Sequence, residues 1–222
     1  MTSFSDSSLA IIGGAGHAGQ PLIQAALQAG HPVRALLRHP AAFPLKHEQL
    51  TVVPGDARDP AALRRLLTGS TALLSTLGHP RGEAAPIFSA VTSQLLPLLR
   101  ELGIGRYLTV TTLYATGQPQ PDPATQAAAA YMQQHFPALL SDRQRELDLL
   151  AASPLNWTVL RLPRLVPGSA TGHVGTSLLH LPGPQLTTPD LAQFLQQQLG
   201  SPQFSRQAPF VANVPAPVAT GS

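Results

Sequence analysis

The stretch GGAGHAG, residues 13–19, constrains the fold more strongly than any other part of this sequence. It follows the short apolar run LAII and precedes QPLIQAALQAG, in which apolar residues recur at helical spacing. A buried strand, a glycine turn and a helix in this order form the start of a βαβ unit. Glycines spaced like Gly13, Gly16 and Gly19 are typical of a backbone that comes close to a phosphate.

Each of these glycines has an expected role. Gly13 lets the chain turn sharply, Gly16 lets the backbone approach a pyrophosphate, and Gly19 lets the helix pack on the strand. We expect His17 and Ala18 beside them, at a helix N-terminus whose free N–H groups and partial positive charge favour phosphates. The alternative is a glycine-rich turn without a ligand. The motif is not a nucleoside-triphosphate P-loop, because no Gly-Lys-Ser/Thr follows it.

The rest of the chain alternates apolar runs typical of strands with helical patterns. The expected strands are residues 9–13, 32–38, 49–56, 71–78, 106–114 and 156–163. The expected helices are residues 17–29, 59–69 with Asp59 as cap and Pro60 first, 87–103 bent or broken near Pro97, 138–153, and 187–200 capped by Thr187 or Thr188. This order predicts an α/β fold of Rossmann type, a doubly wound parallel sheet with helices on both faces.

No repeat or domain boundary interrupts this pattern. Residues 1–222 are therefore expected to form a single NAD(P)-binding Rossmann domain, with its core at about residues 8–212. Residues 116–130, TGQPQPDPATQAAAA, have low complexity and are expected to form a mobile loop. The tail of residues 213–222, NVPAPVATGS, is expected to be disordered. The loops after the fifth and sixth strands are long enough to build a small substrate lobe.

Composition excludes several classes of function. The chain has no cysteine, which excludes disulfides, thiolate metal sites and a cysteine nucleophile. Its histidines show no metal-ligand spacing and no G-x-S-x-G elbow is present, so neither a metal site nor an esterase is expected. The formal charge is +3, but the basic residues are scattered and aromatic residues make up only 5%, which argues against nucleic acid. Without a signal peptide or an apolar stretch of roughly 18 residues, a cytoplasmic protein that does not insert into membranes is expected.

The end of the second predicted strand distinguishes NAD from NADP. An NAD site needs a carboxylate there for the ribose 2′-hydroxyl, but no Asp or Glu occurs between Gly19 and Lys46. Arg38 stands at that strand end instead, and a guanidinium can pair with the 2′-phosphate of NADP. We therefore expect NADP(H) as the cofactor, the alternative being a solvated surface arginine. Asp56 ends the third strand, where its carboxylate either accepts a hydrogen bond from the adenine amino group or stabilises its own turn.

Five stretches of the chain match the motifs of one family in the same order. IIGGAGHAGQ matches a G-x-x-G-x-x-G start, ALLRHP an LVRxP strand end, and VVPGDARDPAAL a GDxxDxxxL segment. NWTVLRLPRL matches a WTxxRPxxL strand, and LTTPDLAQFLQQQL resembles the late helix. The chain thus resembles the atypical short-chain dehydrogenase/reductases, in the NAD(P)H-binding branch with NmrA-like and biliverdin/flavin reductase-like members. The likeness covers roughly residues 9–212.

The chain departs from the superfamily at the residues that carry catalysis. Many members use a Tyr-x-x-x-Lys pair, but the only lysine here, Lys46, precedes the third strand. Arg143, on the helix after the fifth strand, is expected in the place of that lysine near the cofactor, although arginine is not deprotonated in proteins and is a poor proton relay. The family's proline after the sixth-strand arginine is displaced by one residue to Pro163, which is also expected at the cofactor.

Further candidate site residues follow the fourth and fifth strands. Thr76, Leu77 and Gly78 stand where the chain would pass the nicotinamide ribose. Thr111 and Thr112 end the fifth strand, where the family places a Ser or Thr that binds substrate or nicotinamide; the alternative is strand formers whose hydroxyls bond to backbone.

Two tyrosines near these threonines also bear on catalysis. Tyr114 is assigned with the threonines to the catalytic end, as a pocket wall rather than an acid, because no lysine stands beside it. Tyr131 and His135 are helically spaced, and surface packing is the better interpretation of that pair.

These features predict an NADPH-dependent reductase of a small conjugated acceptor such as a flavin or a quinone. Such an acceptor takes its proton from water, while the cofactor carries the hydride. The missing Tyr-Lys pair leaves a second interpretation, a non-catalytic NADP(H)-binding redox sensor. A nucleotide-dependent sugar epimerase or dehydratase is the third, weakened by the absent lysine and the short C-terminal lobe. The sequence leaves the acceptor and the oligomeric state open, a homodimer included.

Overall fold

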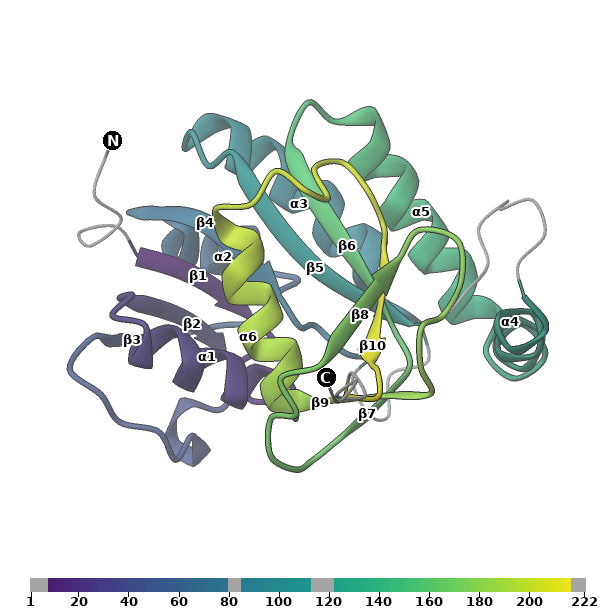
Figure 1. Cartoon of the computed structure of the whole chain (residues 1–222). Helices are drawn as coiled ribbons and strands as arrows, with labels where there is room; N and C mark the ends of the chain where they lie inside the picture. The colour runs from purple at the N-terminus through teal and green to yellow at the C-terminus, as the bar shows by residue number, and fades with distance from the viewer. Residues whose placement is uncertain (1–7, 80–84, 113–121, 217–222) are drawn as a thin grey trace.

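A computed structural model describes residues 8–79, 85–112 and 122–216. An eight-stranded sheet forms its centre, in the order β3-β2-β1-β4-β5-β6-β10-β8 (Figure 1). Its strands are β1 (Ser8–Ile12), β2 (Val33–Leu37), β3 (Leu50–Pro54), β4 (Ser70–Ser75), β5 (Arg106–Thr112), β6 (Asn156–Leu162), β8 (Val174–Ser177) and β10 (Phe210–Asn213). All neighbours are parallel except β8, which pairs antiparallel with β10. The short strands β7 (Arg164–Val166) and β9 (Gln185–Thr187) form a separate parallel pair.

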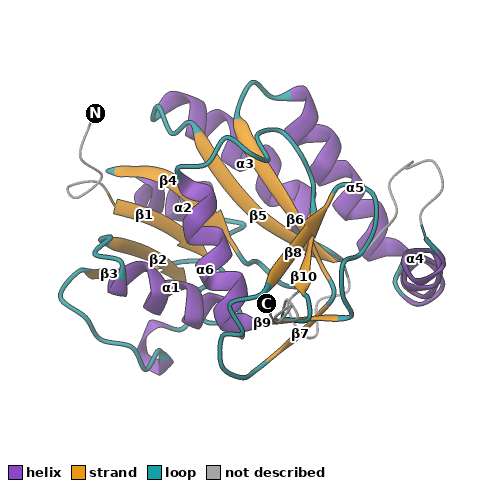
Figure 2. Cartoon of the chain, in the orientation of Figure 1, coloured by secondary structure: helices purple, strands orange, loops and turns teal. Residues whose placement is uncertain are grey.

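Helices cover both faces of this sheet, as a doubly wound fold requires (Figure 2). The helices are α1 (Gly19–Gln28), α2 (Pro60–Leu67), α3 (Phe88–Glu101), α4 (Pro123–His135), α5 (Pro137–Ala152) and α6 (Thr188–Leu199). The predicted fold class is therefore confirmed. Every strand and helix expected from the sequence has a counterpart, although most ends differ by one to three residues.

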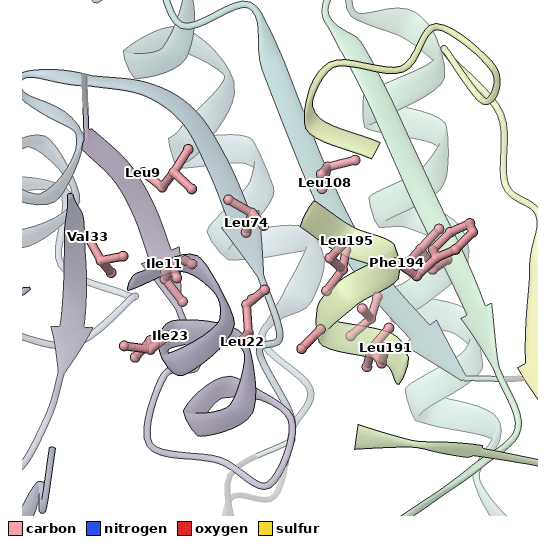
Figure 3. Packing of buried hydrophobic residues seen from close by; sticks show 14 of the residues in the cluster. Leu9, Ile11, Leu22, Ile23, Val33, Leu74, Leu108, Leu191, Phe194 and Leu195 are labelled. Carbon is pink, nitrogen blue, oxygen red and sulfur yellow. The ribbon is translucent and has the colours of Figure 1, made fainter. Parts of the chain in front are cut away.

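Strand periodicity divides the buried side chains into two clusters. On β1, Leu9 and Ile11 belong to the cluster under α1 and α6, while Ala10 and Ile12 belong to the cluster under α2, α3 and α5. Figure 3 shows the first cluster, in which side chains of α1 and α6 meet those of the strands. Fully burying one such aliphatic side chain stabilises the fold by about 1.5–3 kcal/mol. Both faces of the glycine-loop strand are therefore anchored.

The sheet order places a crevice beside the glycine loop. The chain runs outward from β1 to β2 and β3, and then crosses back to β4 on the other side of β1. In sheets of this kind, ligands bind outside the carboxyl ends of the strands, where the order reverses. Here that point lies between β1 and β4.

Two expectations for irregular segments were wrong. Part of the expected loop 116–130 belongs to α4, in which the Asp122 carboxylate accepts hydrogen bonds from the backbone N–H groups of Ala124 and Thr125 and Pro123 follows as the first helical residue. The following alanines favour this helix. The expected tail also begins too early, because Asn213 still belongs to β10 and the Val214 N–H donates to the carbonyl of His173. Residues 113–121 and 217–222 lie outside the described chain.

The Asp190 carboxylate joins three segments of the C-terminal part of the chain. Its carboxylate accepts hydrogen bonds from the N–H and hydroxyl of Thr171, the N–H of Gly172, the hydroxyl of Thr187 and the side-chain amide of Asn213, at 2.6–3.1 Å. Thr187 in turn caps α6 by accepting from the Asp190 N–H at 3.2 Å. Of the two threonines proposed as the cap, Thr187 is the one. Asp190 therefore ties the segment before β8 to α6 and β10.

Replacing Asp190 by asparagine is expected to destabilise the protein in a pH-dependent way. Burial alone raises the pKa of Asp190, but the bonds from Thr171, Thr187 and Gly172 outweigh it and lower the pKa from 3.8 to about 2. A carboxyl group whose pKa is lower in the folded state stabilises the fold at pH values above its unfolded-state pKa. That stabilisation is lost as the pH falls through the folded-state pKa. The wild type should exceed Asp190→Asn by about 2–3 kcal/mol in free energy of unfolding at neutral pH. Urea unfolding should show this difference shrinking between pH 3.8 and pH 2; a constant difference would contradict the assignment.

Candidate functional site

One cavity of about 870 Å³ lies along the carboxyl ends of the parallel strands. It brings together nearly all the residues predicted from sequence to lie at a cofactor or an acceptor. Those that line it are Gly13, Gly16, His17, Ala18, Arg38, Asp56, Thr76, Leu77, Gly78, Thr111, Thr112, Arg143 and Pro163. Gly19 lies behind the cavity wall, and Tyr114 lies outside the described residues. The volume is within the range of about 300–1,000 Å³ that is usual for small-molecule sites.

The glycine loop is held in a conformation that only glycine permits. Gly13 has a φ of +81°, and a Cβ built on it would lie 2.6 Å from the carbonyl carbon and oxygen of Thr76. The Gly16 N–H donates to the Gly13 carbonyl at 3.0 Å, and the N–H groups of Gly19 and Gln20 donate to the Gly16 carbonyl. Within the described chain, the N–H groups of His17 and Ala18 bond to no protein atom. They are the free donors that an anion at this helix N-terminus would use.

Arg38 and Asp56 differ in how firmly they are held. Arg38 directly follows β2, is exposed, and makes no hydrogen bond or ion pair within the described part of the chain. Asp56 accepts from the Arg58 N–H at 2.8 Å and from the Arg58 guanidinium at 2.9 and 3.0 Å. These bonds from Arg58 hold the pKa of the Asp56 carboxyl below its usual range. Asp56 thus stabilises its own turn, one of its two expected roles, while the Arg38 guanidinium remains available to a ligand.

The segment after β4 is fastened to the glycine loop. The Thr76 N–H donates to the carbonyl of Ile12 at 3.0 Å, and its hydroxyl lies 3.4 Å from the carbonyl oxygens of Ile12 and Gly13. Thr76 is buried, whereas Gly78 and the following His79 are exposed at the cavity. His79 was not predicted as a site residue, since nothing in its sequence context marks it.

The two threonines that end β5 differ in environment. Thr111 is 5% exposed, and its buried hydroxyl has no hydrogen-bond partner within the described residues. The Thr112 hydroxyl lies 3.8 Å from the sulfur of Met132 on α4. Within the described residues, neither hydroxyl therefore makes the backbone bond that was the alternative to a site role. An unpartnered buried hydroxyl is costly, so the one on Thr111 is a candidate for a ligand contact.

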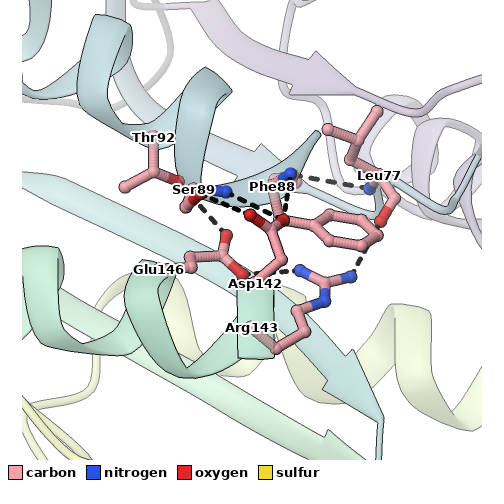
Figure 4. Close-up of polar contacts among 8 residues, drawn as sticks. Leu77, Phe88, Ser89, Thr92, Asp142, Arg143 and Glu146 are labelled. Carbon is pink, nitrogen blue, oxygen red and sulfur yellow. Dashed lines mark hydrogen bonds and ion pairs between the residues drawn. The ribbon is translucent and has the colours of Figure 1, made fainter. Parts of the chain in front are cut away.

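Arg143 reaches the cavity from α5 as part of a buried polar cluster (Figure 4). Its guanidinium donates to the Glu146 carboxylate at 2.6 Å and to the carbonyl oxygen of Leu77 at 3.1 Å. Its Cζ lies 3.3 Å from the centroid of the Phe88 ring. Glu146 also accepts from the Thr92 hydroxyl at 3.2 Å. Arg143 thus lines the cavity and contacts the segment after β4, while its expected role in place of the family lysine stays a prediction; its ion pair with Glu146 was not predicted.

The buried Tyr107 lies close to Glu146 and Thr92 of this cluster. Burial raises its pKa to about 12, and the negative charge of Glu146 adds to the shift. It does not line the cavity. Tyr131 and His135 do not line it either; their ring centroids lie 4.4 Å apart on α4 with the rings tilted by 42°, and Tyr131 is 57% exposed. None of these side chains is placed to exchange a proton with a ligand in the cavity.

Several apolar lining residues were not predicted as site residues. They come from segments brought together only by folding, namely Phe43 and Pro44 after β2, Ile87 before α3, and Leu162 and Leu165 around Pro163. No cluster of His, Cys, Asp or Glu suited to a metal ion occurs among the described residues. In the same part of the chain, no helix combines the length and apolar character needed to cross a membrane.

A doubly wound sheet with a glycine loop and cavity at its switch point defines a nucleotide-binding α/β protein. Residues 13–202 match the model of the NAD(P)H-binding family, and the chain belongs to that family.

Solved structures share this fold at low sequence identity. A short-chain dehydrogenase/reductase from Veillonella parvula, in complex with NADP, has a TM-score of 0.77 and 17% identity, covering 93% of this chain and 94% of that one. ChuY, an anaerobilin reductase from Escherichia coli O157:H7, has a TM-score of 0.73 and 21% identity, with 95% and 100% covered. A candidate NADH-flavin reductase from Streptococcus pneumoniae has a TM-score of 0.74 and 22% identity, with 94% and 100% covered.

Proposed function

We propose that this protein is an NADPH-dependent reductase of a small conjugated acceptor, such as a flavin or a quinone. The observation that carries the proposal is the continuity of the cavity. It runs from the glycine loop and Arg38 to the ends of β5 and β6, so one cavity offers both a dinucleotide cradle and a further apolar end. Hydride transfer needs two partners side by side, and this arrangement provides for both.

The residues at one end fit a dinucleotide phosphate. Gly13 and Gly16 place no side chain at their positions in the loop, and the His17 and Ala18 N–H groups are available to the pyrophosphate. The exposed Arg38 guanidinium makes no hydrogen bond within the described residues, and no carboxylate stands at its own strand end, which favours a 2′-phosphate over a free 2′-hydroxyl. A bound NADPH would supply the hydride. The structural neighbours do not decide between the two nucleotides, because one is in complex with NADP and another is named an NADH-flavin reductase. The choice of NADPH therefore rests on Arg38.

The residues at the other end suit a flat, largely apolar acceptor. Ile87, Leu162 and Leu165 supply apolar walls, and Thr111 and Thr112 line the same cavity. These groups orient a ring and exclude water, and they do not need to donate a proton, because a reduced flavin or quinone takes one from water. The reductase names of ChuY and of the Streptococcus pneumoniae protein agree with this proposal.

The direct test is oxidation of NADPH and NADH by the purified protein with panels of flavins and quinones. We expect turnover with one or more of these acceptors and a preference for NADPH. Tight nucleotide binding with no turnover of any acceptor would overturn the proposal and support the redox-sensor interpretation. Conversion of a sugar nucleotide would support the epimerase interpretation instead.

Replacing Thr111 by valine is expected to lower activity without lowering stability. The change removes a buried hydroxyl that has no partner, so the free energy of unfolding should stay constant or rise by about 1–2 kcal/mol. If the hydroxyl binds the acceptor or the nicotinamide, turnover should fall about tenfold, the value of one neutral hydrogen bond. Thr109→Val is the control, because Thr109 bonds to Tyr107 and faces no cavity. Unchanged turnover in Thr111→Val would remove Thr111 from the site.

A further inference from the structure

Arg143 combines features that a purely structural arginine does not need. Its side chain is 7% exposed, yet it lines the cavity together with Leu77, Thr111 and Thr112. Taking a guanidinium out of water is costly, and such a cation persists only where specific partners hold it. The cost is compatible with function when the cation faces a place where negative charge develops.

The guanidinium is held from three directions, so it does not swing when a ligand enters. Glu146 accepts at 2.6 Å, the Leu77 carbonyl accepts at 3.1 Å, and the Phe88 ring lies under the guanidinium plane (Figure 4).

Each of the two side-chain supports is itself fixed. The Thr92 hydroxyl donates to Glu146 at 3.2 Å, and the Phe88 N–H donates to the Asp142 carboxylate at 2.8 Å. Asp142 also accepts from the Ser89 N–H and hydroxyl, which secures the start of α3. A donor oriented in advance by such a frame loses little freedom when it binds.

These partners leave part of the guanidinium unused. An arginine carries five N–H groups, and the bonds to Glu146 and Leu77 occupy one on each terminal nitrogen. Within the described chain, the remaining N–H groups bond to no protein atom. Arg143 therefore carries unused N–H donors on a side chain that lines the cavity, and Thr111, whose buried hydroxyl is unpartnered, lines the same cavity.

We propose that Arg143 is a catalytic residue whose guanidinium stabilises the negative charge that forms on an acceptor oxygen during reduction. This inference rests on the proposed reductase function. Hydride addition breaks the C–H bond of the reduced nicotinamide and forms a bond from that hydrogen to the acceptor. An electron pair of the conjugated system moves onto the acceptor's carbonyl oxygen, and water then protonates that oxygen. Arg143 donates hydrogen bonds to the oxygen throughout and transfers no proton.

The first test measures charge stabilisation without turnover. The probe is p-nitrophenol, a ring whose anion and neutral form differ in absorbance, titrated with pH in the presence of NADP⁺ and saturating protein. Arg143 should make the bound phenol more acidic, so its apparent pKa should fall when it binds to the wild type. The double variant Arg143→Gln/Glu146→Gln should abolish that fall. An equal fall in wild type and double variant would overturn the proposal even if the protein is a reductase.

The double variant also avoids a folding artefact. Arg143→Gln alone leaves Glu146 buried without its partner, which is strongly destabilising, whereas removing both charges leaves two neutral amides of similar size. Arg145→Gln is the matched control, because Arg145 lies on the same helix, is exposed, and does not line the cavity. Thermal unfolding of each variant shows which of them fold.

The second test measures turnover. With a quinone as acceptor, the folded double variant should lose about 100-fold or more in kcat, the usual effect of removing one such donor, with little change in the KM for NADPH. Arg145→Gln, which leaves the pair of Arg143 and Glu146 intact, should retain most of kcat. An unchanged kcat in the double variant would mean that the ion pair only supports the fold. A loss confined to the KM for NADPH would place Arg143 on the cofactor ribose, and either result overturns the proposal. Absence of turnover in the wild type would refute the proposed function, while the phenol titration would still decide on Arg143.

Discussion

Replacing Gly19 by alanine should strongly weaken NADPH binding and destabilise the fold. A Cβ at this position would lie 2.1 Å from the Gly13 carbonyl oxygen and 2.6 Å from the Gly14 Cα, and both are backbone atoms that cannot rotate away. Either α1 must move off the sheet or the loop must open, which breaks the bond from the Gly16 N–H to the Gly13 carbonyl. We expect a loss of about 100-fold or more in NADPH affinity and about 1–3 kcal/mol in free energy of unfolding.

Two other glycines separate the steric effect from a general effect of alanine. A Cβ at Gly105 meets nothing within 4 Å, and the same holds at Gly30, whose φ of +81° adds backbone strain alone. Gly105→Ala should resemble the wild type, and Gly30→Ala should cost about 1 kcal/mol of stability without affecting nucleotide affinity. Titration with NADPH and urea unfolding measure both quantities. A Gly19→Ala protein that binds NADPH normally would show that the loop does not hold the cofactor.

Replacing Arg38 by alanine should remove the preference for NADPH. Arg38 is exposed at the cavity and makes no pair within the described chain, so its loss should leave the fold intact. A charge-assisted hydrogen bond is worth about 1.5–3 kcal/mol, which corresponds to a loss of about 10–100-fold in NADPH affinity. NADH lacks the 2′-phosphate, so its affinity should not change.

The comparison of the two nucleotides makes this result specific. Arg145→Ala serves as a control for the loss of one positive charge, because Arg145 lies away from the cavity. Calorimetric titration of each protein with NADPH and with NADH gives the four affinities that are needed. An equal loss for both nucleotides, or no loss for either, would refute the contact between Arg38 and the 2′-phosphate.

Local signals predicted the fold well where they were strong. The glycine spacing and the alternation of strands and helices carry the βαβ order, and the Asp59-Pro60 start of α2 is observed with Asp59 accepting from the Ala61 N–H. The same Asp-Pro signal occurs at Asp122-Pro123 and begins α4. The low complexity of residues 116–130 nevertheless favours a loop in a prediction from sequence. The four-residue β10 could not be predicted, because its place between β6 and β8 depends on contacts distant in sequence.

The candidate site also has a part that local sequence predicts and a part that only folding brings together. Residues at or just after the carboxyl ends of strands, such as Thr111 and Arg38, could be placed at the cavity because parallel strands share one carboxyl edge. The i,i+3 pairing of Arg143 with Glu146 is visible in the sequence once a helix is assumed. The contacts of Arg143 with the Leu77 carbonyl and the Phe88 ring join segments more than fifty residues apart. No local pattern records them, and they decide what that arginine can do.

The central claim is that NADPH bound at the glycine loop gives its hydride to an acceptor in the same cavity. A single turnover with NADPH carrying deuterium at the transferred position tests this most directly, with a quinone or flavin in excess over the protein-bound nucleotide. We expect rapid oxidation that deuterium slows, and no oxidation above background in Gly19→Ala. Tight binding of NADPH with no oxidation in the presence of any conjugated acceptor would contradict the claim.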